Sequence, residues 1–372
     1  MYEQIKVDAL KSEISKNINK SNFDLTDLFK YYVDRDNKKF KMVFQQYDQI
    51  GIGVEDNAKD EDNMQSDGAC FEGWAAVLYT YGLEKEGTIF LDEGIDGFDP
   101  DKVKDPEYIY QNPHYGRFLY RALRFSEQYE WFKLEGKLKK AVDNFKKYLD
   151  SHIFMNNVPA DECHISSKDK PDSENAIEMK FAETANGMEK LINLLELKKI
   201  GEVHRQLPVG LFDKNKSSAP HSKKESEQVN SVFPGGKAAI DLWTISGDTF
   251  YMLELKNAKN KKVGAITEMF FYSNYIYDLF VKSQTNPHFA VREERKKNDD
   301  NKLALKDYRG YGELLDKSKS KTIKNVKGFL LLDNNGVHPL ITKDVLKVLN
   351  DNNVSGISYG DHVLKYNFDE IK

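Results

Sequence analysis

Apolar residues in the first half of the chain recur mainly at the three- and four-residue spacing that is typical of amphipathic helices. The small, aromatic and branched residues that follow Cys70 predict a buried helix, and the acidic, breaker-rich stretch 54–69 predicts a loop. The elements expected here are helices over 1–33, 71–84 and 115–150, the last as one long or two shorter helices, and a short strand over 87–93. We therefore predict a mostly helical N-terminal domain over residues 1–165.

The pattern changes after the polar stretch 164–175, which we interpret as a linker. Short apolar runs of strand length now alternate with helical patterns, and a long polar connection covers 213–236. The expected order is helix 176–200, strand 202–212, strands 237–245 and 249–257 joined by a turn at 246–248, helix 264–282, strand 326–333, helix 341–350 and strands 355–359 and 362–368. This order predicts a second domain of the α/β class over residues 176–372.

Composition narrows the class of protein. With 372 residues the chain is long enough for two domains, and 40% hydrophobic with 12% aromatic residues excludes a wholly disordered chain. Two cysteines are too few for a disulfide framework or a zinc site of their own. No apolar run approaches the roughly 18 residues of a membrane span, and the N-terminus lacks the apolar core of a secretory signal. We expect a soluble cytoplasmic protein without a membrane partner.

Charge is distributed unevenly along the chain. The whole sequence has 55 Lys and Arg against 60 Asp and Glu, a net charge of −5, but the segment 254–327 holds 17 basic and 10 acidic residues. A basic surface of this kind can bind nucleic-acid phosphates. The alternative is a solvated face rich in lysine, which is common and carries no function.

The candidate chemistry lies in the two strands around the turn at 246–248. Asp241 is on the first strand, and Glu254, Leu255 and Lys256 end the second, so antiparallel pairing can bring Asp241 beside Glu254. Two carboxylates in an apolar sheet are costly unless a cation lies between them, and Mg²⁺ accepts such oxygen ligands. Lys256, two residues from Glu254, can then orient or deprotonate an attacking water, as phosphodiester hydrolysis requires.

This spacing resembles the catalytic motif of the PD-(D/E)xK nuclease superfamily, although Ile240 stands where the motif has its proline. The resemblance covers roughly 176–335 and implies a restriction-endonuclease-like αβββαβ core, a mixed central sheet flanked by helices. It also implies that Asp241, Glu254 and the backbone carbonyl of Leu255 bind the metal, and that Lys256 assists the water. Further residues at positions that the superfamily uses are Glu183 or Glu189 as an additional acid on the first helix, Glu268 on the second helix, and Lys259, Lys261 and Lys262 as nucleic-acid contacts.

We therefore expect a Mg²⁺- or Mn²⁺-dependent endo- or exonuclease that acts on DNA rather than RNA, in restriction, defence or repair. A homodimer is compatible with cutting both strands of a duplex. One alternative is a nuclease-like module that binds nucleic acid or protein without catalysis. Another is that Asp241 and Glu254 are exposed cross-strand residues paired with Lys256 and Lys237, an arrangement of little energetic consequence.

Overall fold

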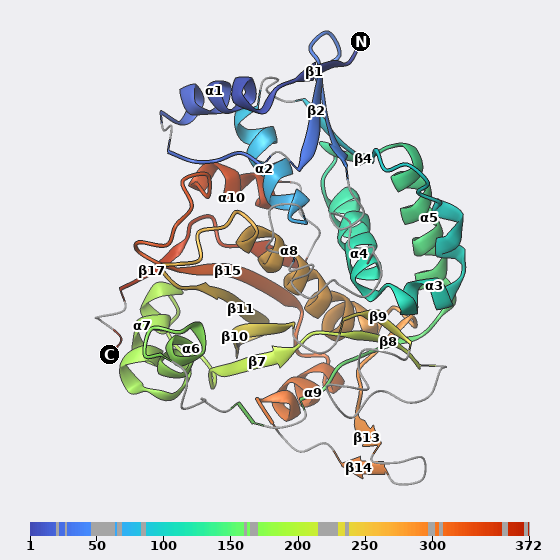
Figure 1. The fold of residues 1–372 in the computed structure, drawn as a ribbon. Coiled ribbons are helices and arrows are strands. Elements are labelled where there is room, and N and C mark those ends of the chain that lie inside the picture. The colour runs from blue at the N-terminus through green and yellow to red at the C-terminus, as the bar shows by residue number, and fades with distance from the viewer. Residues whose placement is uncertain are drawn as a thin grey trace. The chain divides into compact units, whose positions relative to one another are not determined.

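The computed structural model describes residues 1–19, 22–26, 28–45, 64, 69–82, 87–159, 162–163, 170–214, 230–234, 238–296, 302–304, 308–351, 356–367 and 371. The chain divides into two compact units, and neither is continuous in sequence. The first unit consists of Met1–Asp150, Lys262–Glu268 and His338–Val354, and the second of Ser151–Lys261, Met269–Val337 and Ser355–Lys372. The elements of both are labelled in Figure 1.

The first unit contains a five-stranded sheet. Its strands, in spatial order, are β1 (Glu3–Ile5), β2 (Phe29–Asp34), β3 (Lys39–Phe44), β4 (Thr88–Glu93) and β5 (Phe132–Leu134). The first three pair antiparallel, whereas β4 runs parallel to β3 and β5 runs parallel to β4. Burial alternates along β3 and β4, so one face of the sheet is covered. Aromatic rings fill that core, with Phe118 in edge contact with both Phe44 and Phe71.

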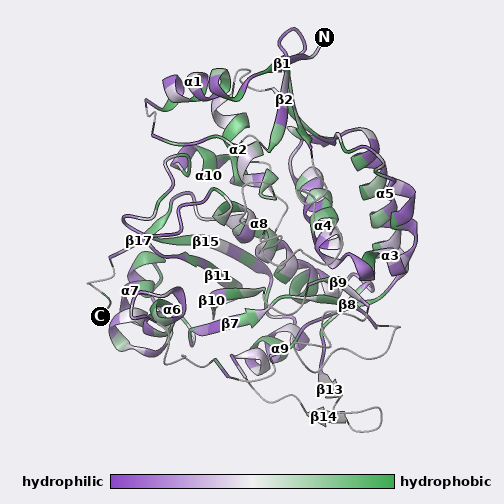
Figure 2. Ribbon diagram, viewed as in Figure 1, coloured by the Kyte–Doolittle hydropathy of each residue, from purple (hydrophilic) through white to green (hydrophobic). Residues whose placement is uncertain are grey.

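Helices complete the first unit. They are α1 (Val7–Ile18), α2 (Phe71–Tyr81), α3 (Pro106–Gln111), α4 (Pro113–Gln128), α5 (Gly136–Ser151) and α10 (Lys343–Asn350). Figure 2 shows hydrophilic and hydrophobic residues mixed along α5, whose apolar positions, such as Leu138, Val142 and Phe145, are the buried ones. The C-terminal α10 packs against α2, and the Tyr129 hydroxyl donates to the Leu349 carbonyl, so a late segment of the chain joins this unit.

Two predictions for the N-terminal half are wrong. The expected helix over 1–33 is helical only over α1, and the half is not a mostly helical domain, because it contains the sheet β1–β5. The alternating burial over Lys39–Phe44 is a strand pattern that the helical interpretation missed. The chain passes from the first unit to the second after Asp150, rather than between the predicted domain bounds at 165 and 176. The segment His338–Val354, which contains α10, then returns to the first unit, and two consecutive domains do not allow for such a return. The expected loop 54–69 lies largely outside the described residues.

The second unit is built on a mixed sheet. Its strands are β7 (His204–Pro208), β10 (Ala239–Ser246), β11 (Thr249–Lys256), β15 (Asn325–Asp333), β16 (Ile357–Tyr359) and β17 (Leu364–Tyr366). The spatial order is β16-β15-β11-β10-β7, with β17 also on β15. β10 pairs antiparallel with β7 and β11, and β11 pairs parallel with β15. These strands follow the predicted order, and the α/β class of this half is confirmed.

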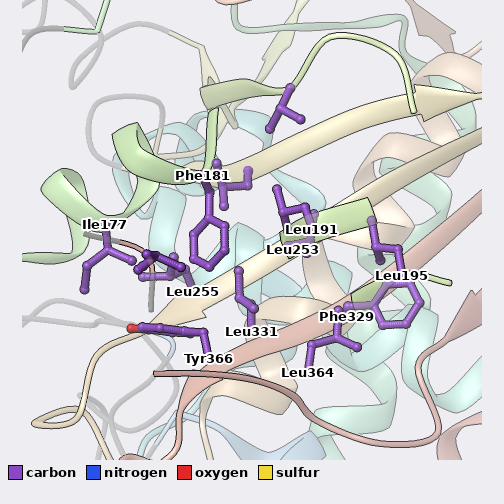
Figure 3. Close-up of a cluster of buried hydrophobic side chains, with 13 residues drawn as sticks. Ile177, Phe181, Leu191, Leu195, Leu253, Leu255, Phe329, Leu331, Leu364 and Tyr366 are labelled. Carbon is purple, nitrogen blue, oxygen red and sulfur yellow. The ribbon is translucent and has the colours of Figure 1, made fainter. Parts of the chain in front are cut away.

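Two helices cover one face of this sheet, α6 (Glu174–Glu183) and α7 (Ala185–Leu194). The sequence predicts one helix over 176–200, whereas the structure has two. The second begins after Thr184, whose hydroxyl accepts a hydrogen bond from the Gly187 N–H and so caps the new helix. Figure 3 shows the buried cluster beneath them, in which Ile177, Phe181 and Leu191 meet Leu253 and Leu255 of the sheet. The other face meets α8 (Ala265–Ile276), whose Ser273 hydroxyl contacts the Met252 sulfur.

Smaller elements complete the second unit. A second sheet has the order β12 (Phe289–Ala290), β6 (Phe154–Asn156), β8 (Leu211–Asp213) and β9 (Ser231–Phe233), and β13 (Glu294–Lys296) pairs with β14 (Lys302–Ala304). The helix α9 (Tyr311–Lys319) precedes β15. The predicted strand 202–212 is thus two strands in different sheets, and the predicted polar connection contains β9. Within the described residues, no helix combines the length and apolar character needed to cross a membrane.

Candidate functional site

The β10–β11 hairpin places Asp241 opposite Glu254. Its turn contains Gly247 at φ +62°, a conformation that favours glycine, and the paired residues run from Ser246 with Thr249 to Leu242 with Leu253. One position further along this register, Asp241 faces Glu254. Since residues directly opposite in antiparallel strands share a face, their carboxylates are on the same side of the hairpin.

The Asp241 carboxylate is held against the next strand. Its Oδ2 accepts a hydrogen bond of 2.8 Å from the Leu255 backbone N–H, and the side chain is half-buried. This bond fixes the carboxylate beside the segment of β11 that contains both Glu254 and Lys256. The structure therefore brings together the three residues that the sequence motif singled out.

Glu254 and Lys256 form a buried ion pair. They are 1% and 3% exposed, and the Lys256 ammonium donates to Glu254 Oε1. The alternative that Asp241 and Glu254 are exposed is therefore wrong for Glu254, although Glu254 does pair with Lys256 as that alternative expected. Its other expected partner, Lys237, lies outside the described residues. Removing both charges from water costs more free energy than forming an ion pair at the surface. Buried ion pairs are therefore uncommon, and buried charged groups cluster at functional sites. The Tyr366 hydroxyl donates to the Lys256 carbonyl at 3.1 Å and fixes the end of the strand.

A fourth charged residue reaches this site from α6. Glu178 is 2% exposed, and its pKa is raised from its ordinary value of 4.5 to about 9, chiefly by burial and then by the charge of Asp241. The side-chain amide of Gln206 donates to Glu178 Oε2 at 2.8 Å, which lowers the pKa and so opposes part of that rise. Two carboxyl groups are thus close enough to disfavour joint ionisation.

The acid on the first helix is therefore Glu178, and the assignment to Glu183 or Glu189 is corrected. Glu183 has a side chain 56% exposed and pairs with Arg205 at 3.1 Å, and Glu189 is exposed on α7. Position alone could have identified Glu178, because it lies among the buried residues Ile177 and Phe181 of an otherwise apolar helix face.

The remaining predicted residues are three lysines that follow β11, and Glu268 of α8. Lys259, Lys261 and Lys262 are exposed, and Lys259 pairs with Asp172 at 2.9 Å. Glu268 is buried on α8 and belongs to the first unit, whereas Asp241 belongs to the second. We leave Glu268 out of the candidate site, and the three lysines stay a prediction about nucleic-acid contacts.

The residues present fit a hard divalent cation. Among the residues that the structure describes, no group of three or more His, Cys, Asp or Glu side chains is arranged as a metal centre. Mg²⁺, however, commonly takes one or two carboxylates and completes its shell with waters and substrate phosphate. A cation beside Asp241 and Glu178 would relieve the repulsion that raises the pKa of Glu178.

Comparison with known proteins adds no family to this picture: no family model, curated protein or solved structure matches the chain.

Proposed function

We propose that the chain is a nuclease of the PD-(D/E)xK type that depends on a divalent cation and hydrolyses phosphodiester bonds, with DNA rather than RNA as its substrate. The observation that carries the proposal is the assembly of the buried Glu178, Glu254 and Lys256 around the half-buried Asp241. Buried carboxyl groups with a perturbed pKa, next to a buried lysine, are costly to fold and are typical of sites that do chemistry.

The topology around the assembly supports the same proposal. The helices α6 and α7 precede the antiparallel strands β7, β10 and β11, and α8 then leads by way of α9 to β15, which is parallel to β11. With the shorter strands β8, β9 and β12–β14 left aside, this order is compatible with an αβββαβ core, in which Asp241 and Glu254 would lie on the second and third strands. The topology alone would not justify an activity, since one fold can carry many functions.

The chain's own residues divide the work of hydrolysis. Asp241, with either Glu178 or Glu254, would hold Mg²⁺ or Mn²⁺, which when bound polarises the phosphate and lowers the pKa of its water. Lys256 supplies a positive charge at the same position, where it can orient the attacking water or stabilise the negative charge that develops on the phosphate. The ion pair with Glu254 keeps that ammonium in place inside the sheet until substrate arrives.

A binding module without catalysis is the second candidate. The observation in its favour is that the buried Glu254 already pairs with Lys256, so that its charge is balanced without a cation. Such a module would still bind nucleic acid, but it would have no use for a cation at Asp241.

The test uses purified wild type, Asp241→Asn and the matched control Asp248→Asn, which changes an exposed aspartate in the turn of the same hairpin. Each is incubated at low salt, where phosphate contacts are strongest, with plasmid, linear duplex DNA, single-stranded DNA and RNA, in Mg²⁺, Mn²⁺ or EDTA. We expect cleavage that requires the cation and is lost only in Asp241→Asn. Binding without cleavage in every condition would favour the binding module, and neither binding nor cleavage would contradict both candidates.

A further inference from the structure

Two neighbouring residues of β7 contact the same helix, which a regular strand does not allow. The Arg205 guanidinium donates to the Asn175 carbonyl on α6 at 3.2 Å and pairs with Glu183 at 3.1 Å, and Gln206 donates to Glu178 of α6 at 2.8 Å. Successive side chains of a regular strand point to opposite faces of the sheet. The alternation must therefore be broken at Gln206.

The backbone of Gln206 shows how it is broken. Its φ is +53°, in the left-handed region that residues other than glycine rarely adopt. The pairing of β7 with β10 runs through Leu207 with Ile240 and Arg205 with Leu242, so Gln206 lies opposite Asp241. A strained residue therefore lies next to two acids of the proposed site, and strain of this kind persists only where the surroundings enforce it.

The segment that leads into α9 enforces it. The Arg309 guanidinium donates to the Gln206 carbonyl at 2.8 Å. Gly310, at φ +73°, lies so close to the His204 ring that a Cβ there would overlap it, and His204 Nε2 contacts the Glu313 carboxylate at 3.1 Å. Three contacts from residues 309–313 therefore fix two residues of β7, His204 and Gln206.

We propose that Gln206 is a positioning residue of the nuclease site: Arg309 holds its left-handed backbone, which turns its side-chain amide to Glu178 and fixes the direction of that carboxyl beside Asp241. The inference rests on the function proposed above. It assigns to Gln206 and Arg309 no contact with the substrate. Their role is to present Glu178 to the cation, as hydrogen-bond partners of metal ligands commonly do.

A regular strand would pair with β10 without backbone strain. We therefore attribute the left-handed backbone of Gln206 to the contact that it allows with Glu178. With an extended backbone, the Gln206 side chain would point to the sheet face opposite that of Arg205 and would not reach α6. Glu178 would then lack the amide that now holds its Oε2. The hydrogen bond joins the side chains of Gln206 and Glu178, which are 28 residues apart in the sequence. It depends in turn on Arg309, which lies 103 residues after Gln206.

The test measures Mn²⁺ binding directly, by the electron paramagnetic resonance signal of the free ion, so that it does not depend on cleavage. The variants are Gln206→Ala, Gln206→Gly, Arg309→Met and Arg309→Lys, with Asp241→Asn as the reference for loss of the site. Gln284→Ala is the matched control, because the Gln284 side-chain amide also donates a hydrogen bond within the second unit, but from η5 (Lys282–Gln284) and to the Phe280 carbonyl. Urea unfolding of each variant is measured in parallel.

We expect Gln206→Ala and Gln206→Gly to weaken Mn²⁺ binding by about 10- to 100-fold, as loss of a ligand's partner commonly does. Glycine relieves the left-handed strain, so Gln206→Gly should be at least as stable as Gln206→Ala while binding Mn²⁺ equally weakly. Arg309→Lys should retain more affinity than Arg309→Met, and Gln284→Ala should bind as wild type does. A merely structural role for Gln206 would instead let glycine restore the affinity.

The outcomes distinguish the positioning role of Gln206 from the proposed nuclease function on which it rests. If Asp241→Asn loses Mn²⁺ binding but Gln206→Ala and Gln206→Gly keep the wild-type affinity, the positioning role is wrong and the nuclease site stands. If wild type binds no Mn²⁺, or Asp241→Asn binds it as wild type does, the proposed site is wrong and the role of Gln206 falls with it.

Discussion

Replacing Glu178 with glutamine should make the metal-free protein more stable at neutral pH, although it removes a residue of the proposed site. The pKa of Glu178 is about 9 in the folded protein, against an ordinary value of 4.5. Between these values the folded state keeps the proton that the unfolded state releases. The contribution of Glu178 to the stability of wild type is therefore fully present below pH 4.5 and is lost as the pH rises towards 9. Glutamine is neutral in both states and keeps a similar shape.

The size of the effect follows from the same two values. Each pH unit above 4.5 lowers the wild-type free energy of unfolding by about 1.4 kcal/mol. Relative to wild type, Glu178→Gln should gain about 1 kcal/mol at pH 5.5 and up to about 4 kcal/mol at pH 7.5. The change between the two pH values, about 3 kcal/mol, is independent of how well glutamine packs.

The assay is urea unfolding in EDTA at pH 5.5 and 7.5, followed by circular dichroism and by tryptophan fluorescence, to which the buried Trp243 of β10 contributes. Glu189→Gln, an exposed change on α7, is the control and should stay within about 0.5 kcal/mol of wild type at both pH values. A Glu178→Gln variant whose stability relative to wild type does not change with pH would refute the reasoning. Adding Mg²⁺ should stabilise wild type and reduce the advantage of the variant.

Three further predictions follow from the contacts around the site. Lys256→Met leaves Glu254 buried without its ammonium and should lower the free energy of unfolding by about 3–5 kcal/mol, whereas the double variant with Glu254→Gln should recover most of that loss in a double-mutant cycle. Leu253→Ala truncates a fully buried side chain beneath α6 and α7 and should cost about 2–5 kcal/mol in the same assay; a loss under 1 kcal/mol would contradict the packing. Changing Lys259, Lys261 and Lys262 together to alanine should lower the slope of log affinity against log salt for DNA by about 2–3, and an unchanged slope would show that these lysines do not contact phosphates.

Local pattern was enough to predict the hairpin that carries the motif. Asp241 and Glu254 lie in short apolar runs on either side of a glycine turn, and antiparallel pairing then determines which residues are opposite. The elements of the second unit follow from the same patterns. The sheet of the first unit was missed because the helix predicted over 1–33 was extended across β2, and no element was predicted over β3.

The rest of the site depends on contacts between distant parts of the chain. Helical spacing places Glu178 beside Ile177 and Phe181 on the buried face of α6, but only the fold brings it close to Asp241. Gln206 has no preference for a left-handed backbone, and it adopts one where Arg309 binds its carbonyl. Such features are determined by tertiary structure, and local sequence patterns carry no signal for them.

The central claim is that Asp241 belongs to a cation-dependent catalytic site. The most direct test compares the cleavage rates of two variants. The single-turnover rate of cleavage is measured at saturating Mg²⁺ for Asp241→Asn and for Asp248→Asn on the best substrate of wild type. The account predicts that Asp241→Asn is slower by on the order of 10³-fold, while Asp248→Asn cleaves as wild type does. Equal rates for the two variants, or cleavage by wild type that continues in EDTA, would contradict it.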